Sequence, residues 1–190
     1  LRQRINETGA QNASAYCAKL RGDEHEFHEL VCLLTINETY FYREPEQLHF
    51  LVERLVPRIL ARKRDASPVR ILSAGCSTGE EPYSMAMALR DKYGDSAAHL
   101  FMLMGGDIDK NALAKARAAR YNDYSFRSLA PDLRERYFER HGRWAWSVKD
   151  EVRQQVHFRH LNLLDEGHPH GLQNFDVIFV RYVSIYFDAP

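Results

Sequence analysis

The chain has 190 residues, of which 45% are hydrophobic and 27% charged, a length and balance that predict one globular domain with room for a small appendage. Lys and Arg number 26, and so do Asp and Glu, so the formal net charge is zero and nothing global indicates a nucleic-acid partner. No apolar run is long enough to span a bilayer, so we expect no insertion into a membrane.

The cysteines favour a reducing compartment. Cys17, Cys32 and Cys76 are an odd number with no paired spacing, which argues against a framework of disulfides. We therefore expect a cytoplasmic protein.

The first stretch of the chain has a helical pattern. Residues 13–20 and 26–34 carry apolar side chains at helical spacing, and Gly22 and Asp23 form the break between them. Two short helices cannot bury an apolar face alone, so we expect them to pack on the following domain or on sequence outside this chain. Residues 35–43 then break the pattern with a segment that is both aromatic and polar.

A longer helix is predicted next. It opens at Pro45, has one apolar face as far as Leu60, and is expected to kink at Pro57. The basic run at residues 62–64 closes it, and a loop leads to a short apolar strand that begins at Val69.

A turn at residues 75–79 joins this strand to another helix. Glu80 and Glu81 place carboxylates in the first turn of that helix, where its dipole favours them, and Pro82 suits an early helical position. Three interpretations of the turn are open at this point. It matches the G-x-S-x-G nucleophile elbow, with Ser77 as the nucleophile of a serine hydrolase; it could cradle a nucleotide-containing cofactor; or it is a tight turn that binds nothing.

The rest of the chain alternates strands with helices. Further strands are predicted at residues 100–104, 156–161 and 175–180, the last apolar enough to be buried on both faces, and helices at residues 111–119 and 130–138. Trp144 and Trp146 fall in a region that the pattern does not assign. The alternation predicts an α/β fold with a parallel, doubly wound sheet.

Such a sheet places its ligand beyond the carboxyl ends of its strands. We therefore expect the turn at residues 75–79, Asp107, Asn162 and Arg181 to converge on one crevice. Asp107 ends the second strand, where a carboxylate can accept hydrogen bonds from both ribose hydroxyls of a nucleoside, so it favours the cofactor interpretation.

The hydrolase and metal interpretations have less support. A triad in the order Ser, acid, His could use Asp165 with His168 or His170, but no His follows Asp176. The pair His168 and His170 lacks further ligands at a recognisable spacing, so we expect no metal site.

Five segments in order resemble one family. TINETYFYRE, ILSAGCSTGEEPYS, GGDID, NLL and FDVIFVRYVSIYF are similar to successive motifs of the CheR-type chemotaxis receptor methyltransferases. The resemblance implies a Rossmann-like class I methyltransferase domain at residues 45–190, preceded at residues 1–44 by the remnant of a helical N-terminal domain and a linker. It also implies later strands and a small inserted β-subdomain after the fourth strand, so the methyltransferase domain is expected to be C-terminally incomplete here.

The resemblance also implies a cofactor site and its residues. The cofactor is S-adenosylmethionine, with S-adenosylhomocysteine as the product. The residues expected against it are Asn37, Thr39, Arg43, Gly75, Glu81, Asp107 on the ribose, Asn162 and Leu163 near the adenine, Arg181 and Tyr182. Alternative roles are helix caps for Asn37 and Thr39, a turn or cap role for Asp107, and a dipole-stabilising surface carboxylate for Glu81.

The implied reaction is methyl transfer to glutamate side chains of chemoreceptors, whose cytoplasmic domain is the expected partner. Arg43 would orient the substrate carboxylate and Tyr186 would offer a hydroxyl, although Tyr186 could also be a core aromatic residue. An ionised glutamate needs no general base. Tyr182 stands where the family usually has Asn, which favours the alternative of a binding module that senses the cofactor without catalysis.

Overall fold

The computed structural model describes residues 1–165 and 172–183, and its centre is a parallel sheet. The strands are β1 (Val69–Ala74), β2 (Phe101–Asp107), β6 (Val156–His160) and β7 (Val177–Val180), in the order β6-β2-β1-β7. All three pairings are parallel, for example Ile71 with Leu103 and with Val177. This confirms the predicted α/β class and the four predicted strands.

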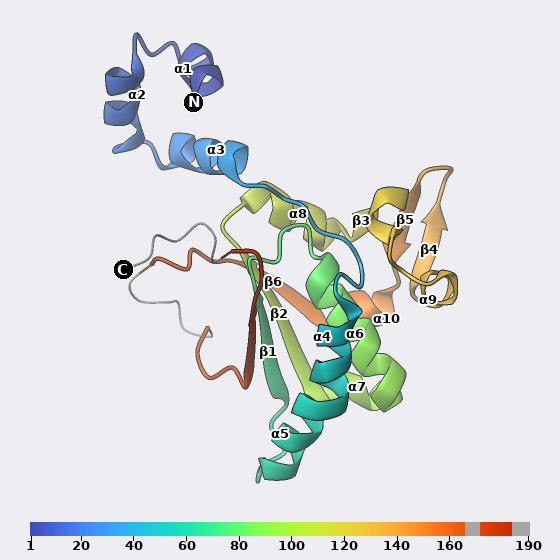
Figure 1. Ribbon diagram of the computed structural model, residues 1–190. Coiled ribbons are helices and arrows are strands. Elements are labelled where there is room, and N and C mark those ends of the chain that lie inside the picture. Colours follow the sequence, from blue (N-terminus) through green and yellow to red (C-terminus); the bar gives the residue numbers. More distant parts are fainter. Residues whose placement is uncertain (166–171, 184–190) are drawn as a thin grey trace.

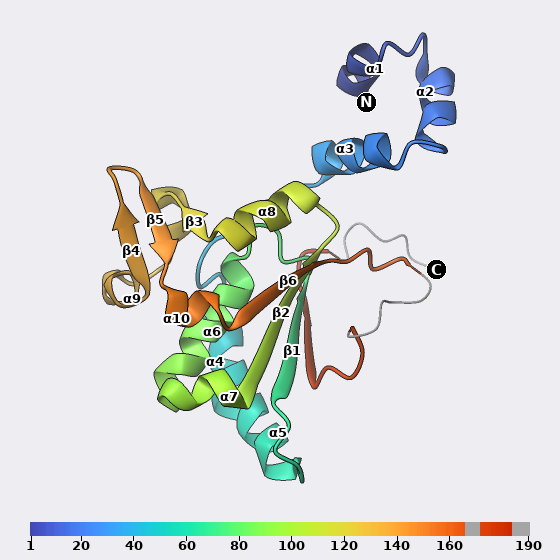
Figure 2. The same ribbon diagram turned by 180° about the vertical axis from the view of Figure 1, so that it is seen from behind.

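Helices lie along one face of this sheet (Figures 1 and 2). They include α4 (Pro45–Phe50), α5 (Val56–Arg62), α6 (Glu80–Tyr93), α7 (Ala97–Leu100) and α10 (Asp150–Arg153). The main core lies between them and the sheet and contains Ile71, Leu103, Tyr83 and Met87. A smaller apolar cluster, which includes Leu72, Met104 and Leu161, lies apart from this core.

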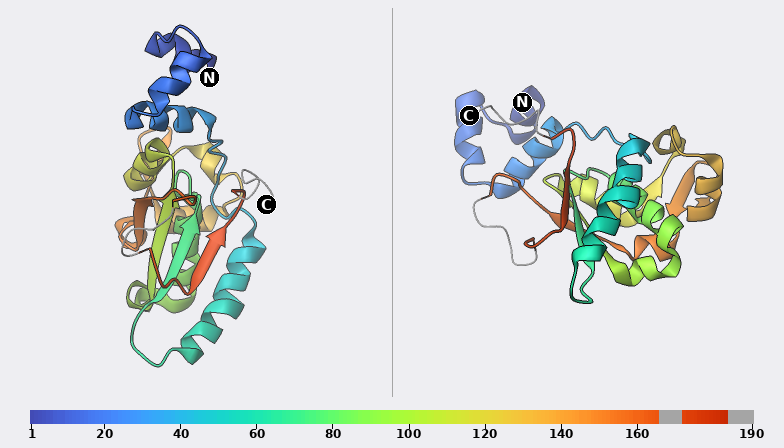
Figure 3. Two further views of the ribbon diagram at one scale, coloured as in Figure 1. Left: turned by 90° about the vertical axis from the view of Figure 1, so that its left-hand side faces the viewer. Right: turned by 60° about the horizontal axis from the view of Figure 1, so that its bottom comes forward.

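Strand β7 is less buried than the sequence indicated. It forms an edge of the sheet beside β1 (Figure 3). Ile178 is 55% exposed and Val180 47%, whereas Val177 is buried. The expectation of burial on both faces is therefore wrong in the described residues, because successive side chains of a strand point to opposite faces and the described helices cover the face opposite to Ile178 and Val180.

The region around the two tryptophans forms a second, antiparallel sheet. Its strands are β3 (Arg120–Tyr121), β4 (Phe138–His141) and β5 (Ala145–Val148), in the order β3-β5-β4. A 3-10 helix (Asp123–Phe126) and α9 (Pro131–Tyr137) belong to the same inserted unit, which follows α8 (Lys110–Ala118). This insert lies between α8 and β6 and includes the region that the sequence pattern did not assign.

The long helix predicted from Pro45 changes its geometry in the middle. A π-helical turn (Leu51–Leu55) separates α4 from α5, directly before Pro57. Proline has no N–H to donate to the carbonyl four residues earlier, so the regular helical pattern cannot continue through it. In the π-helical turn the N–H of Val56 donates to the carbonyl of Leu51, five residues earlier. In the same register the carbonyl of Val52 would face the missing N–H of Pro57, and it accepts a hydrogen bond from Lys92 Nζ at 3.1 Å.

Three N-terminal helices project from this body (Figure 1). They are α1 (Arg2–Thr8), which the sequence pattern did not indicate, α2 (Ala13–Leu20) and α3 (Glu24–Leu34). Only Tyr16 and Glu26 are buried within residues 1–34. The expected packing on the following domain occurs through α3, where Cys32 Sγ donates to Asp109 at 3.0 Å.

The described chain has two further features that bear on the expectations. None of its helices is long and apolar enough to cross a membrane. All three cysteines are free thiols.

Candidate functional site

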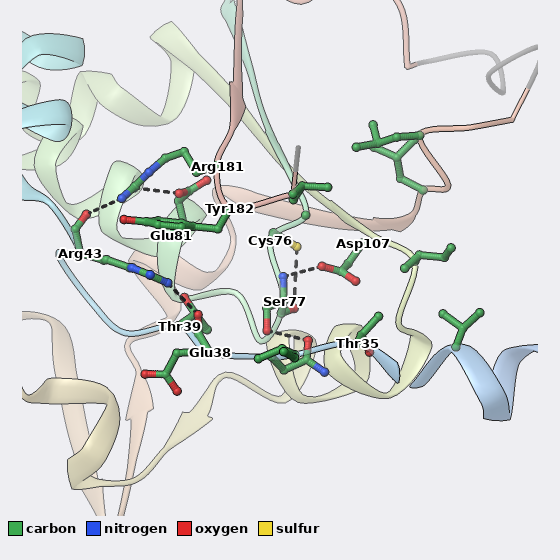
Figure 4. Close-up of a pocket in the computed structure, with 18 of the residues that line it drawn as sticks. Thr35, Glu38, Thr39, Arg43, Cys76, Ser77, Glu81, Asp107, Arg181 and Tyr182 are labelled. Carbon is green, nitrogen blue, oxygen red and sulfur yellow. Dashed lines mark hydrogen bonds and ion pairs between the residues drawn. The ribbon is translucent and has the colours of Figure 1, made fainter. Parts of the chain in front are cut away.

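A cavity of about 360 Å³ opens beyond the carboxyl ends of the parallel strands (Figure 4). Its lining includes Gly75 after β1, Asp107 at the end of β2, Asn162 after β6 and Arg181 after β7. The predicted convergence of these segments is confirmed. The cavity is also lined by the other expected cofactor residues, Asn37, Thr39, Arg43, Glu81, Leu163 and Tyr182. Tyr186, His168 and His170 lie outside the described residues.

The glycine turn forms the floor of the cavity. Gly75 and Gly79 have φ values of 75° and 93°, a region that favours glycine. The N–H groups of Gly75 and Cys76 both donate to the carbonyl of Gly106, at 2.7 and 3.0 Å, and so fix the turn to the end of β2. A side chain at Gly79 would lie only 2.8 Å from Ala116 Cβ, so the turn and α8 pack closely.

Asp107 is buried and faces both the turn and the cavity. Its Oδ2 accepts from the N–H of Ser77 at 2.7 Å, and its Oδ1 accepts from the N–H of Asp109 at 2.8 Å. Burial raises the pKa of Asp107, and these two hydrogen bonds oppose the rise. Each carboxylate oxygen can accept more than one hydrogen bond, so Asp107 retains acceptor capacity for hydroxyl groups of a ligand. It is not a helix cap, since Asp109 is the N-cap of α8.

Asp109 is a residue that the functional interpretation missed. Besides the N–H groups of α8, it accepts hydrogen bonds from Cys32, from Thr35 at 3.2 Å and from Asn37 at 2.7 Å. Burial alone would raise the pKa of Asp109, but hydrogen bonds from Cys32, Asn37 and the helix backbone outweigh it and the pKa is lowered. Asp109 therefore ties the segment at residues 35–43, here called the strap, to the body. A capping Asp before a helical pattern was the available sequence signal.

Ser77 makes its side-chain hydrogen bond to an amide. Its Oγ donates to Asn37 Oδ1 at 2.9 Å, and among the described residues no histidine bonds to it. A nucleophile elbow requires a base within hydrogen-bond reach of the serine. The described part of the site therefore lacks the arrangement of a serine hydrolase. The alternative role of Asn37 and Thr39 as helix caps is not found there either, since neither residue caps one of the neighbouring helices.

Glu81 and Arg181 form a partly buried ion pair at the other side of the cavity. Arg181 Nη1 lies 2.9 Å from Glu81 Oε2, and Ser73 Oγ donates to Glu81 Oε1 at 2.7 Å. Burial raises the pKa of Glu81, against the hydrogen bond from Ser73 and the charge of Arg181. Arg181 Nη2 also donates to the carbonyl of Arg43 at 3.1 Å, so Arg181 holds the end of the strap. Glu81 is thus not a surface carboxylate.

Arg43 and Tyr182 lie face to face at the mouth of the cavity (Figure 4). The guanidinium carbon of Arg43 is 3.6 Å from the centre of the Tyr182 ring. Arg43 Nη1 donates to the carbonyl of Glu38 at 2.8 Å. Tyr182, at the position where the resemblance leads one to expect Asn, is therefore a stacking partner of the arginine.

The wall beyond β6 is largely apolar. Leu161 and Leu163 line it, and a side chain at Gly106 would lie 2.6 Å from Leu161 Cδ2. Asn162 also lines it, but its Nδ2 donates to Asp165 Oδ1 at 2.7 Å, so the amide is held within its own loop.

These features fit a nucleoside cofactor that carries a charged tail. The leucines offer apolar surface for a flat base, Asp107 offers acceptors for ribose hydroxyls, and Glu81 is a carboxylate near the glycine turn. The cavity volume of about 360 Å³ lies within the usual range for ligand sites, about 300 to 1,000 Å³. No group of three or more potential metal ligands gathers in the part of the chain that the structure describes.

Comparisons with known proteins agree with this geometry. A family model described as the SAM-binding domain of CheR methyltransferases matches residues 37–190. The chain is 38% identical to a probable biofilm formation methyltransferase, WspC, of Pseudomonas putida, over 100% of this chain and 44% of that protein. It is 37% identical to a probable chemotaxis protein methyltransferase of Rhizobium etli, over 85% of this chain and 61% of the relative. It is 35% identical to chemotaxis protein methyltransferase 2 of Vibrio cholerae, over 99% of this chain and 66% of that relative. The chain therefore spans less than two thirds of each of these relatives.

Proposed function

The chain belongs to the CheR methyltransferase family, whose SAM-binding domain it carries, and from this premise we propose that its protein methylates glutamate side chains of chemoreceptors. The observation that carries the proposal is the meeting of Asp107, Glu81 and Arg43 on one cavity. Two carboxylates suit the polar groups of the cofactor, and a guanidinium suits the carboxylate of a substrate.

S-adenosylmethionine is the cofactor of this domain, and it supplies a methyl group already activated by the sulfonium. We assign Asp107 to the ribose hydroxyls, Leu163 and Asn162 to the adenine, and Gly75 with Glu81 to the rest of the molecule. The strap, with Asn37 and Thr39, covers the site on the side of the N-terminal helices. Arg181 and Tyr182 complete it beyond β7.

The substrate carboxylate is positioned rather than activated. A glutamate is ionised at neutral pH and is itself the nucleophile, so no residue has to remove a proton. Arg43 orients this carboxylate, and Tyr186 contributes a hydroxyl from the last motif. The protein lowers the barrier by alignment and by excluding water.

The substrate class rests on the names of relatives. Several of them are called chemotaxis protein methyltransferases, and one is called a biofilm formation methyltransferase. We infer that the substrate is the cytoplasmic domain of a receptor in such a signalling system and that the protein acts in the cytoplasm. We also infer that residues 1–44 are a helical N-terminal part and its linker, followed by the methyltransferase domain at residues 45–190.

A binding module without catalysis is the second candidate. The stacking of Tyr182 on Arg43 favours it, because the arginine already has a partner at 3.6 Å before any substrate arrives. The two candidates differ in methyl transfer but not in cofactor binding.

The test is the transfer of radiolabelled methyl groups to purified cytoplasmic fragments of chemoreceptors. We expect transfer by the wild type, a loss of about 100-fold in Arg43→Ala with cofactor affinity retained, and little loss in Ser77→Ala. If the wild type transfers no methyl groups and Tyr182→Asn does, the natural protein is instead a sensor of the cofactor. Labelling of Ser77 by a fluorophosphonate probe would revive the hydrolase interpretation.

A further inference from the structure

Aromatic rings and guanidinium groups alternate in a row that leads from the cavity to the inserted unit. The Arg43 guanidinium lies 3.6 Å from the Tyr182 ring centre and 5.5 Å from that of Tyr40. The Arg127 guanidinium lies 3.8 Å from the Tyr40 ring centre and 4.0 Å from that of Tyr124. These five side chains, Tyr182, Arg43, Tyr40, Arg127 and Tyr124, form what we call the stacked row.

Glu38 joins the two arginines of the row. Its side-chain Oε1 accepts from Arg127 Nη2 at 2.6 Å and from the Tyr124 hydroxyl at 3.2 Å. Its backbone carbonyl accepts from Arg43 Nη1 at 2.8 Å. One residue of the strap is thus bound through its carboxylate to the inserted unit and through its carbonyl to Arg43.

The row lies beside well-packed structure at Arg127, while the rings at its two ends, Tyr182 and Tyr124, are 45% and 60% exposed. Arg127 directly follows the 3-10 helix of the inserted unit, and beside it the N–H of Phe41 donates to the carbonyl of Ser125 at 2.9 Å. Phe41 is fully buried and stacks on Phe126. At the other end, the Tyr182 ring lies between Arg43 and the guanidinium of Arg181, at 5.6 Å from the latter.

This arrangement fixes the orientation of Arg43. Stacking sets the plane of a guanidinium, and a hydrogen bond at one nitrogen sets its rotation within that plane. Among the described residues, Nη1 is the one nitrogen of Arg43 with a hydrogen-bond acceptor. The edge formed by Nε and Nη2 is left for a ligand, and that edge can bind a carboxylate with two hydrogen bonds.

We propose that Arg127 is a positioning residue, which acts through Glu38 and Tyr40 to present the Nε and Nη2 edge of Arg43 to the substrate carboxylate. This rests on the proposed methyl transfer to glutamate. Arg127 is itself paired with Glu38, so it does not bind the substrate as a free cation. Its removal frees the Glu38 carboxylate, which then competes with the substrate for Arg43.

The experiment compares Arg127→Ala with Arg134→Ala. Arg134 is a matched control, because it belongs to the same inserted unit, lies 4.0 Å from the Trp146 ring centre and pairs with Asp123, whereas Arg127 pairs with Glu38 and stacks on Tyr40. We expect Arg127→Ala to lower kcat/KM for a receptor fragment by about 10- to 100-fold, mainly through a higher KM. Arg127→Lys keeps the charge and loses the planar stack, so its kcat/KM should lie between those of the wild type and Arg127→Ala. Adding Glu38→Gln to Arg127→Ala should lower the KM part of the way back to the wild-type value, because the competing carboxylate is gone.

A second readout needs no turnover. In the wild type, the ring current of Tyr182 shifts the NMR signal of the Arg43 Nε–H group, and we expect this signal to move in Arg127→Ala and stay in place in Arg134→Ala. Calorimetry should give the same S-adenosylhomocysteine affinity for all of these variants.

The outcomes separate the two proposals. Absence of transfer by the wild type would overturn the proposed function, while the NMR comparison would still test the row. A kcat/KM of Arg127→Ala equal to that of Arg134→Ala, or an Arg43 signal that does not move, would overturn the role of Arg127.

Discussion

Asp107 is a buried carboxyl group and Glu81 a partly buried one, and burial raises the pKa of both. Backbone N–H groups oppose this rise at Asp107, and Ser73 and Arg181 oppose it at Glu81. A carboxyl group with a raised pKa loses its charge at a higher pH than an exposed one. The ability of these groups to accept hydrogen bonds from a cofactor therefore depends on pH in a range where ordinary carboxyl groups stay ionised.

The affinity for S-adenosylhomocysteine should accordingly fall as the pH is lowered from 8 towards 5. The ionised forms bind, and they are lost as the pH falls through the raised pKa values, so the loss begins above the ordinary values of 3.8 for Asp and 4.5 for Glu. Calorimetric titrations at several pH values measure this. Glu81→Gln removes one titrating group and should flatten the profile. A wild-type affinity that begins to fall only at the ordinary pKa values of 3.8 and 4.5 would contradict the assignment.

The sequence predicted some of these residues and missed others for a physical reason. Asp107 could be predicted because it ends an apolar strand, and Arg43 because of the motif that contains it. Glu38 and Asp109 gain their roles from partners distant in the chain, 89 residues away for Arg127 and 72 for Asn37. No local pattern encodes such pairs, so the strap and the stacked row required the tertiary structure.

At the scale of elements, the turn between β1 and α6 combines two constraints on one glycine. Gly79 has a φ of 93° and begins α6, and a side chain there would meet Ala116 Cβ at 2.8 Å and Phe158 Cζ at 3.0 Å. Gly142 has a φ of 65° with nothing within 4 Å of the corresponding position. A side chain at Gly142 would therefore meet backbone strain alone, whereas one at Gly79 would meet both backbone strain and a steric conflict.

Gly79→Ala should lower the free energy of unfolding by more than Gly142→Ala. Strain at a positive φ costs about 1 kcal/mol, and close packing adds about 1 to 3 kcal/mol at Gly79 alone. Chemical denaturation of the two variants beside the wild type measures the difference. Equal losses would mean that the turn and α8 do not pack as tightly as described.

Elements with a strong apolar pattern could be predicted, and elements without one could not. Residues 138–148 form a hairpin although its strands, FERH and AWSV, have little apolar alternation, and its Trp144 is 68% exposed. β7 is an uninterrupted apolar run in the sequence, yet alternate residues are exposed, because the described helices cover one face of the sheet and Ile178 and Val180 point to the other. α1 has no buried residue, so it leaves no apolar periodicity to detect.

At the scale of the whole molecule, the strap connects parts that would otherwise be separate. It links the projecting helices α1 to α3 with the cavity, and it contacts the glycine turn, α8, the inserted unit and the segment after β7. Helices α1 to α3 are held together mainly by Glu26, which pairs with Arg4 and accepts from Tyr16, each at 2.6 Å. The binding site is thus assembled from segments distributed along the described chain. We infer that its cavity binds S-adenosylmethionine and its product.

The most direct test of that claim is a calorimetric titration of the protein with S-adenosylhomocysteine, beside Asp107→Asn. We predict one bound ligand per wild-type chain and an affinity lower by about 1.5 to 3 kcal/mol, roughly 10- to 150-fold, in Asp107→Asn, because a charged acceptor of hydroxyl groups is lost. Thermal unfolding of both proteins controls for damage to the turn. A wild type that binds neither S-adenosylhomocysteine nor S-adenosylmethionine, or a folded Asp107→Asn that binds as tightly as the wild type, would contradict the account.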